Sequence, residues 1–222
     1  MDSQSPGGPE LTGDPQSTYD RIAAHFSKTR EYAWPEVESF LDERTAVRAL
    51  DVGCGNGRHA ELLAERANAV VGVDLSRELL REAIARARER GYDETASFVH
   101  GDAAALPIAT DAVGLAVYVA TLHHLPTREA RVRSLDELAR VLAPGGTALV
   151  SAWSTAHDRF DREEGFDTTV DWTLPGGETV PRYYHIYSPA EFETDLAESS
   201  LDPVDIDVSS GNCYATVTVS SA

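Results

Sequence analysis

The stretch LDVGCGNGRHA at residues 50–60 decides the fold. It places glycine at alternate positions, Gly53, Gly55 and Gly57, directly behind an apolar run and directly before a helical pattern. Glycine lets the backbone turn with positive φ and lets a ligand approach main-chain atoms with no Cβ in the way. Between a first strand and its helix, such a loop lies at the carboxyl edge of a parallel sheet, where ligands bind. A glycine-rich turn can also serve only to pack a helix on a strand, so the loop alone leaves both interpretations open.

Strand and helix patterns alternate around this loop. Apolar strand patterns occupy 46–52, 69–73, 97–100, 113–120 and 147–153. Apolar residues at helical spacing lie between most of these strands: Ala60, Leu63, Ala64 and Ala67; Leu80, Ala83, Ile84 and Ala87; and Leu135, Leu138, Ala139 and Leu142, before a stop at residues 144–146. Alternation of this kind predicts an α/β fold, in which helices cover both faces of a parallel sheet.

The N-terminal part of the chain precedes this alternation. Residues 1–16 are polar and rich in proline and glycine, so we expect a disordered tail followed by a single domain over residues 17–222. A first helix is predicted where Tyr19, Ile22, Ala23 and Phe26 share one face. A second helix is predicted to begin at Pro35.

The last third of the chain breaks the alternation. Residues 154–187 are polar and aromatic with weak periodicity, and we expect an insertion that covers the substrate side of the sheet. The capping box at 188–191 opens a final helix. The segments 204–208 and 214–219 are predicted to form a hairpin on the sheet edge.

The chain is strongly acidic. Its formal net charge is -18 at pH 7, and its 19 basic residues include a single lysine, Lys28. An acidic, lysine-poor surface keeps a protein soluble at molar salt, where the Debye length is roughly 3 Å. We therefore expect a halophilic source, with an ordinary acidic cytosolic protein as the alternative.

The sequence shows no pattern of a signal peptide and no apolar run long enough to cross a bilayer, so we expect a cytoplasmic protein with no membrane association. Its two cysteines, Cys54 and Cys213, match no metal-binding spacing, so no metal site is predicted.

Carboxylates stand at the ends of successive predicted strands. Asp51 ends the first strand, Asp74 ends the second, and Asp102 follows the third. A dinucleotide fingerprint would need glycine at position 58, where the chain has Arg58. Acidic neighbours disfavour a pyrophosphate and favour a cationic ligand such as a sulfonium. The alternative is that these aspartates are ordinary solvated acids on an acid-rich surface. That interpretation explains the number of acidic residues but not their positions at the ends of successive strands.

Together these residues predict a pocket for S-adenosylmethionine. Asp74 would accept hydrogen bonds from the ribose hydroxyls, and Asp102 would accept one from the exocyclic amine of adenine. The predicted cofactor-binding residues are Asp51, Gly53, Cys54, Gly55, Asn56, Gly57, Asp74, Leu75, Asp102 and Ala103.

From about residue 45 to 154 the chain resembles the class I S-adenosylmethionine-dependent methyltransferases, and the final hairpin extends the resemblance to 219. That family implies a doubly wound, Rossmann-like seven-stranded sheet with an antiparallel last strand. Three stretches are similar to the tRNA wobble-uridine carboxymethyl methyltransferases: YDRIAAHFSKTREYAWPEVESFL at 19–41, VYVATLHHLPTREARVRSLDELARVLAPGGTALVSAW at 117–153 and RYYHIY at 182–187. This resemblance implies a tRNA substrate, methylated on the carboxylate of 5-carboxymethyluridine at the anticodon wobble position.

The resemblance also implies a partner. Members of that family work with a small zinc-binding activator subunit that pairs with the sheet edge near the third strand. The short strand at 97–100 would offer such an edge, and the protein would then be a heterodimer.

The predicted chemistry requires a group that binds the acceptor. A carboxylate, with a reference pKa near 4, is already ionised at neutral pH, so its methylation needs no general base. Planar arginine is suited to bind and orient it. The candidates are Arg30 and Arg182, with Tyr184 and His185 as neighbours. Of the adjacent pair His123 and His124, we expect His124 to line the pocket. Surface ion pairs for the arginines and a structural role for the histidines are the alternatives.

RNA binding by so acidic a protein would require a local basic patch. The candidates for it are Lys28, Arg30, Arg58, Arg128, Arg131 and Arg182. Two other functions remain open on the sequence: methylation of a small molecule such as a quinone precursor, and a non-catalytic subunit that binds S-adenosylmethionine.

Overall fold

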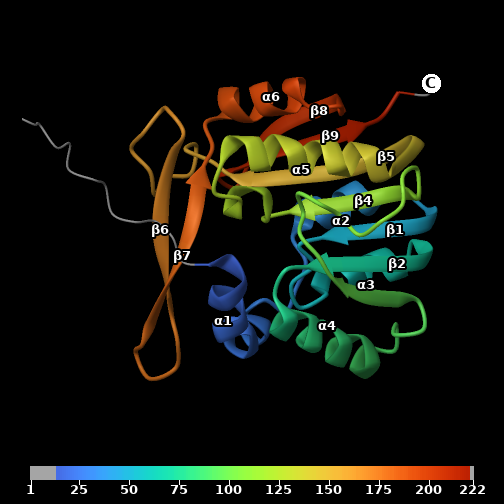
Figure 1. The fold of residues 1–222 in the computed structure, drawn as a ribbon, viewed down its shortest axis with the longest axis horizontal. Helices are drawn as coiled ribbons and strands as arrows, with labels where there is room; N and C mark the ends of the chain where they lie inside the picture. The colour runs from blue at the N-terminus through green and yellow to red at the C-terminus, as the bar shows by residue number, and fades with distance from the viewer. Residues whose placement is uncertain (1–13, 221–222) are drawn as a thin grey trace, which may run out of the picture.

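The computed structural model of the protein describes residues 14–220 (Figure 1). The predicted tail lies outside the described residues except for residues 14–16, where the prediction is wrong. The side chain of Asp14 accepts a hydrogen bond from Ser17 N at 3.0 Å, and the first helix starts at Pro15. Proline suits that position because its missing N–H would have no partner in the first helical turn.

The elements follow the predicted alternation, with a sixth helix and two hairpins in the last third. In chain order they are α1 (Pro15–Thr29), α2 (Pro35–Leu41), β1 (Ala46–Val52), α3 (Arg58–Ala64), β2 (Ala67–Asp74), α4 (Arg77–Arg90), β3 (Ala96–His100), β4 (Val113–Val119), the 3-10 helix η1 (Leu122–His124), α5 (Arg128–Val141), β5 (Leu142–Trp153), β6 (Phe166–Thr173), β7 (Thr179–Ile186), α6 (Pro189–Glu198), β8 (Asp202–Ser209) and β9 (Asn212–Thr218).

Seven strands form the main sheet, in the order β3-β2-β1-β4-β5-β9-β8. The pairs from β3 to β5 are parallel, whereas β9 is antiparallel to both β5 and β8. This confirms the predicted seven-stranded sheet with an antiparallel last strand. The chain moves outward from β1 to β3 and then returns to pair β4 with β1, which places the switch point of the sheet beside the glycine loop.

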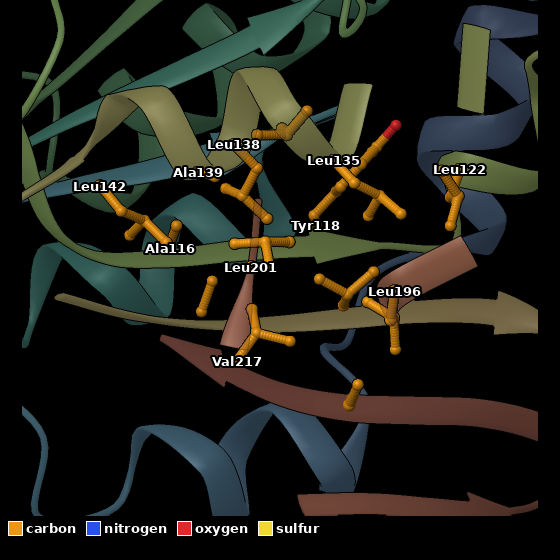
Figure 2. Close-up of a cluster of buried hydrophobic side chains, with 14 of the residues drawn as sticks. Ala116, Tyr118, Leu122, Leu135, Leu138, Ala139, Leu142, Leu196, Leu201 and Val217 are labelled. Carbon is orange, nitrogen blue, oxygen red and sulfur yellow. The ribbon is translucent and has the colours of Figure 1, made fainter. Parts of the chain in front are cut away.

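The central strand β4 is buried on both faces. Leu115, Val117 and Val119 pack with residues of α2, α3 and α4. Ala116 and Tyr118 point to the opposite face, where Figure 2 shows them against side chains of α5. An almost continuous apolar strand is what a parallel sheet covered by helices on both faces requires.

Two predicted helix ends are wrong. Helix α3 ends at Ala64, so Ala67 already begins β2, and α5 ends at Val141, so Leu142 begins β5. Leu142 is fully buried, and Ala67 is partly buried against a hydrophobic cluster that includes residues of β1 and β2. An apolar residue at the junction of a helix and a strand satisfies the period of either element, so periodicity does not locate the boundary.

The segment predicted only as an insertion contains a separate two-stranded sheet. Strands β6 and β7 pair antiparallel from Phe166 opposite Ile186 to Thr173 opposite Thr179. Figure 1 shows this hairpin standing beside α1 at one end of the main sheet. Trp172 and Val180 pack against Ile22 of α1, so the helix and the hairpin together form a wall over that end.

Candidate active site

A cavity of about 770 Å³ lies at the carboxyl ends of the parallel strands. The glycine loop after β1, the ends of β2 and β4, helix α1 and strand β7 all contribute residues to its lining. Pockets that bind small ligands typically span roughly 300 to 1,000 Å³. The cavity therefore has the size and the place in the sheet of a ligand site.

The glycine loop turns back against the end of β2. Gly53 N and Cys54 N both donate to the carbonyl of Val73, at 2.7 and 3.0 Å. Gly53 has a φ of +68°, and a Cβ at this position would overlap the side chain of Thr121. Glycine is required here because of both the left-handed backbone and the close approach of the loop to β4's end.

Asp74 joins two loops at the cavity floor. Its Oδ2 accepts from Gly55 N at 2.8 Å, and its Oδ1 accepts from Ser76 N at 2.8 Å. Burial raises the pKa of this carboxyl to about 6, although both hydrogen bonds oppose the shift. Each oxygen retains a second acceptor position, so the side chain is able to bind a pair of hydroxyls.

Asp51 lies beneath the loop and is 1% exposed. Neither of its oxygens has a hydrogen-bond partner among residues 14–220. Burial and then the charge of Asp74 raise the pKa of Asp51 to about 7. A buried carboxyl without partners is rare in proteins, and it favours a donor or a cation in the space above it.

Helix α1 is fixed over the cavity by polar contacts from Asp20, within the helix, and from Arg30, just after it. Asp20 Oδ1 accepts from Ser76 Oγ at 2.6 Å and from Glu78 N at 3.1 Å, which joins α1 to the start of α4. After the helix, the carbonyl of Arg30 accepts from Asn56 Nδ2 at 2.9 Å. The helix and the glycine loop are therefore connected directly.

His124 is held in one neutral tautomer. Its Nδ1 lies 2.9 Å from the carbonyl of Tyr183, which only accepts, so Nδ1 carries the proton. Its Nε2 then accepts from the Tyr19 hydroxyl at 2.8 Å. Burial lowers the pKa of His124 to about 4, so the ring is uncharged at neutral pH.

His123 also lines the cavity in a neutral form. Its Nδ1 accepts from Trp153 N at 2.9 Å, and burial holds its pKa well below the usual range. Its ring lies 4.9 Å from that of Tyr184. Both histidines of the pair therefore face the cavity, where the sequence analysis expected one.

Five arginines line the same cavity, and none of them forms an ion pair with a residue that the structure describes: Arg30, Arg58, Arg133, Arg159 and Arg182. Burial and the nearby charge of Arg30 lower the pKa of Arg58 to about 10, which leaves it protonated at neutral pH. Unpaired guanidinium groups in a cavity of an acidic protein favour an anionic ligand.

Two members of the predicted basic patch are occupied elsewhere. Arg128 pairs with Asp195 at 2.7 Å, and the buried Arg131 lies 3.6 Å from Glu191. The prediction that these two arginines are free to bind RNA is therefore wrong, because α6 supplies carboxylates that the sequence did not place near them.

Strand β7 sends alternate side chains to opposite sides. Arg182 and Tyr184 face the cavity, and Arg182 Nη1 donates to the Tyr184 hydroxyl at 2.6 Å. His185 faces away and is held between Asp167 Oδ1 at 2.7 Å and Glu191 Oε1 at 2.8 Å. The prediction that His185 belongs to the site is therefore wrong.

Comparisons with known proteins agree with this geometry. The sequence profile of a family described as a methyltransferase domain matches residues 49–146. A tRNA (carboxymethyluridine(34)-5-O)-methyltransferase of Arabidopsis thaliana is 34% identical over 172 residues, which are 77% of this chain and 39% of that protein. A protein of Encephalitozoon cuniculi described as a methyltransferase is 34% identical over 178 residues, 76% of this chain and 78% of that protein. The chain belongs to the class I S-adenosylmethionine-dependent methyltransferases.

Solved structures share the fold of this methyltransferase. The CcbJ methyltransferase of Streptomyces caelestis aligns with a TM-score of 0.75 at 19% identity, over 94% of this chain and 100% of that one. The methyltransferase solved in complex with the Haloferax volcanii Trm112 activator aligns with a TM-score of 0.68 at 16% identity, over 94% and 99%. The chain spans 39% of the length of its Arabidopsis relative.

Membership of this family confirms S-adenosylmethionine as the predicted cofactor. Eight of the ten predicted cofactor-binding residues line the cavity: Gly53, Cys54, Gly55, Asn56, Asp74, Leu75, Asp102 and Ala103. The other two are not in the lining, since Asp51 lies beneath the loop and Gly57 precedes α3. Within residues 14–220, no helix has both the length and the apolar character needed to cross a membrane.

Other residues of the methyltransferase site were not predicted from the sequence. Arg159 and Thr121 line the cavity, and Trp172 lies behind it. No motif marks them, because each is brought to the site by a loop or a hairpin whose position depends on tertiary packing. Tyr19 and Phe26, which share one face of the predicted first helix, line the cavity, and so does Trp34.

Proposed function

We propose that the protein transfers a methyl group from S-adenosylmethionine to the carboxylate of 5-carboxymethyluridine, or of a related derivative, at the wobble position of tRNA. One observation carries this proposal. A single cavity is lined both by the predicted cofactor-binding residues and by arginines that have no ion-pair partner among the described residues. The curated relatives named as tRNA (carboxymethyluridine(34)-5-O)-methyltransferases support the choice of substrate.

The residues on the cofactor side fit S-adenosylmethionine. Gly53 and Gly55 leave the main chain bare beside the cavity, and Asp74 offers two acceptor oxygens at the end of β2. The unpaired carboxyl of Asp51 beneath the loop favours a positive charge above it. When bound, the cofactor supplies an electrophilic methyl group on a sulfonium.

The residues on the other side fit a carboxylate. Arg30 and Arg182 come from different elements and lie against one shared ring, that of Trp172. They would hold the acceptor oxygen in line with the methyl group, and such orientation contributes roughly 7 to 11 kcal/mol in favourable cases. His124 is neutral and already accepts from Tyr19, so it shapes the site and does not act as a general base.

We infer that a small activator subunit completes the enzyme in the cytoplasm. Strand β3 (Ala96–His100) is an end strand of the sheet, and its Val99 is 37% exposed. A free strand edge accepts a strand from another chain by main-chain hydrogen bonding. The Haloferax volcanii structure supports this, since it is a complex of a methyltransferase with the Trm112 activator. The zinc of that subunit follows from the family resemblance alone.

The net charge of -18 requires the RNA to meet a local positive region. The five cavity arginines, Arg30, Arg58, Arg133, Arg159 and Arg182, supply it in place of Arg128 and Arg131. Molar salt would also screen the repulsion between the acidic surface and the phosphates.

The test is incubation of the protein and isotopically labelled S-adenosylmethionine with bulk tRNA and, separately, with a small-metabolite extract, each with and without an activator candidate. We expect label in the wobble nucleoside of tRNA. Label in small metabolites and never in RNA would instead support the quinone-precursor class of substrate. Cofactor binding without transfer to any substrate, together with unchanged wobble nucleosides in a deletion strain, would indicate a non-catalytic subunit.

A further inference from the structure

The indole of Trp172 lies at the junction between the hairpin and α1. The residue is 7% exposed and packs with Ile22 and Val180. Its Nε1–H donates to His25 Nδ1 at 3.0 Å, which fixes the orientation of the ring. The indole is therefore held by groups from both elements that wall the cavity.

Two arginines from these different elements lie against this one ring. The guanidinium carbon of Arg30, the residue that follows α1, is 5.2 Å from the ring centroid, and that of Arg182, on β7, is 4.8 Å away. Both distances are within the roughly 6 Å over which an aromatic face attracts a cation. Arg182 is 9% exposed, and its Nε has no hydrogen-bond partner among the described residues.

Two guanidinium groups near one another repel, and the repulsion grows as water is excluded. No carboxylate of residues 14–220 pairs with Arg30 or Arg182. Arg30 also lies 6.0 Å from the Phe26 ring and Arg182 lies 5.1 Å from the Tyr184 ring, but among the described residues Trp172 is the ring that both arginines share. The negative face of Trp172 therefore compensates part of both charges before an anion arrives. An aromatic ring does so without neutralising either arginine, so both stay available to a ligand.

We propose that Trp172 is a positioning residue that directs Arg30 and Arg182 toward a single carboxylate. This rests on the proposed function, because the carboxylate is that of the modified uridine. Trp172 acts through the arginines and does not itself touch the substrate. The His25 contact makes the ring orientation, and hence the direction of both arginines, dependent on α1.

The test compares W172F, which keeps an aromatic face, with W172L, which keeps apolar bulk and removes the face. The first readout is NMR of the arginine Nε–H groups in the free protein. We expect ring-shifted signals of Arg30 and Arg182 in the wild type, retained in part by W172F and lost in W172L. Signals that W172L leaves unchanged would overturn the positioning role, whatever the substrate is.

The second readout is binding of two anticodon stem-loops that carry 5-carboxymethyluridine or its neutral amide analogue. The preference is the ratio of the affinities for the carboxylate and the amide stem-loops. We expect this ratio to fall roughly tenfold in W172L and to stay close to the wild-type value in W172F. Affinity for S-adenosylmethionine, measured by calorimetry, should be the same in all three proteins. A carboxylate preference that is undiminished in W172L overturns the inference. A wild type with no such preference contradicts the proposed function, and the arginine signals then still decide the role of Trp172.

Discussion

At the scale of single residues, Gly53 is the position with the least freedom to change. It combines a φ of +68° with direct contact to Thr121, whereas Gly91 has a φ of +76° and open space around it. G91A therefore tests backbone strain alone, and G53A adds a steric overlap. We expect a loss of roughly 1 to 2 kcal/mol in the free energy of unfolding for G91A and at least about 3 kcal/mol for G53A, measured in urea. Equal losses would show that Thr121 moves aside without cost.

Arg182 tests the substrate side of the site. R182K keeps the charge and loses the planar fork that donates to Tyr184 and lies against Trp172. We expect kcat/KM for the RNA to fall roughly 10- to 100-fold while the Kd for S-adenosylmethionine stays the same. R81K, at an exposed arginine of α4, is the matched control and should change neither. A parallel loss of cofactor affinity in R182K would show that Arg182 supports the fold of the whole cavity.

Asp51 gives a pH dependence with a definite sign. Its pKa is about 7 in the folded protein against an ordinary value of 3.8, so the folded state retains a proton that the unfolded chain has released. The contribution of Asp51 protonation to the free energy of unfolding is present in full below pH 3.8 and is lost as the pH rises to 7. D51N should therefore gain stability relative to the wild type, by a few kcal/mol at most, as the pH rises from 3.8 to about 7, with no further gain above that pH.

Urea unfolding at several pH values checks this prediction, with D207N on the exposed strand β8 as the control for loss of one negative charge. If the difference between D51N and the wild type were independent of pH, the Asp51 carboxyl would be ionised in the folded protein.

At the scale of elements, one of the carboxylates of α6 that pair with arginines of α5 is fully buried, whereas Glu191 and Glu198 are partly exposed. Asp195 is fully buried and accepts from Arg128 Nε at 2.7 Å and from the Tyr187 hydroxyl at 3.1 Å. D195A leaves both donors without their acceptor, and we expect a loss of roughly 3 kcal/mol in the free energy of unfolding. E178A removes the exposed ion pair with Arg21 and should cost less than about 1 kcal/mol. Similar losses for the two variants would contradict the role given to burial.

The elements of the main sheet were predictable because apolar residues repeat with the period of each element. The hairpin of β6 and β7 was not, since along β6 only Trp172 is buried. On β7 the buried side chains include Arg182, Tyr184 and His185, which polarity would place at the surface. A strand that faces a polar cavity has no apolar alternation to reveal it, and this is also why His185 was assigned to the wrong side.

At the scale of the whole molecule, the charge of -18 opposes folding through self-repulsion. The expectation of a halophilic source then has a direct consequence. Raising KCl from about 0.1 M to about 2 M should raise the Tm, measured by calorimetry, because the Debye length falls from roughly 10 Å to about 3 Å or less. A Tm that stays constant or falls as KCl is raised would show that repulsion among the surface carboxylates does not destabilise the protein at low salt.

The sequence predicted the overall topology and the cofactor side of the cavity because their signals are local. Gly53 and Gly55 lie in the loop that follows β1, and Asp74 is the last residue of β2, so strand order alone brings them together. The substrate side depends on how α1 and the hairpin pack against each other. No local pattern records that packing, so Trp172 and Arg159 were found only in the structure.

The central claim is that the cavity joins a methyl donor to a carboxylate acceptor, and the chemistry of the product tests it most directly. RNA methylated by the protein with labelled S-adenosylmethionine should be treated with mild alkali before its wobble nucleoside is measured by mass spectrometry. The account predicts that the label is released as methanol and that the carboxymethyl nucleoside is recovered, as for a methyl ester. Label that survives alkali on a base or ribose would contradict the account.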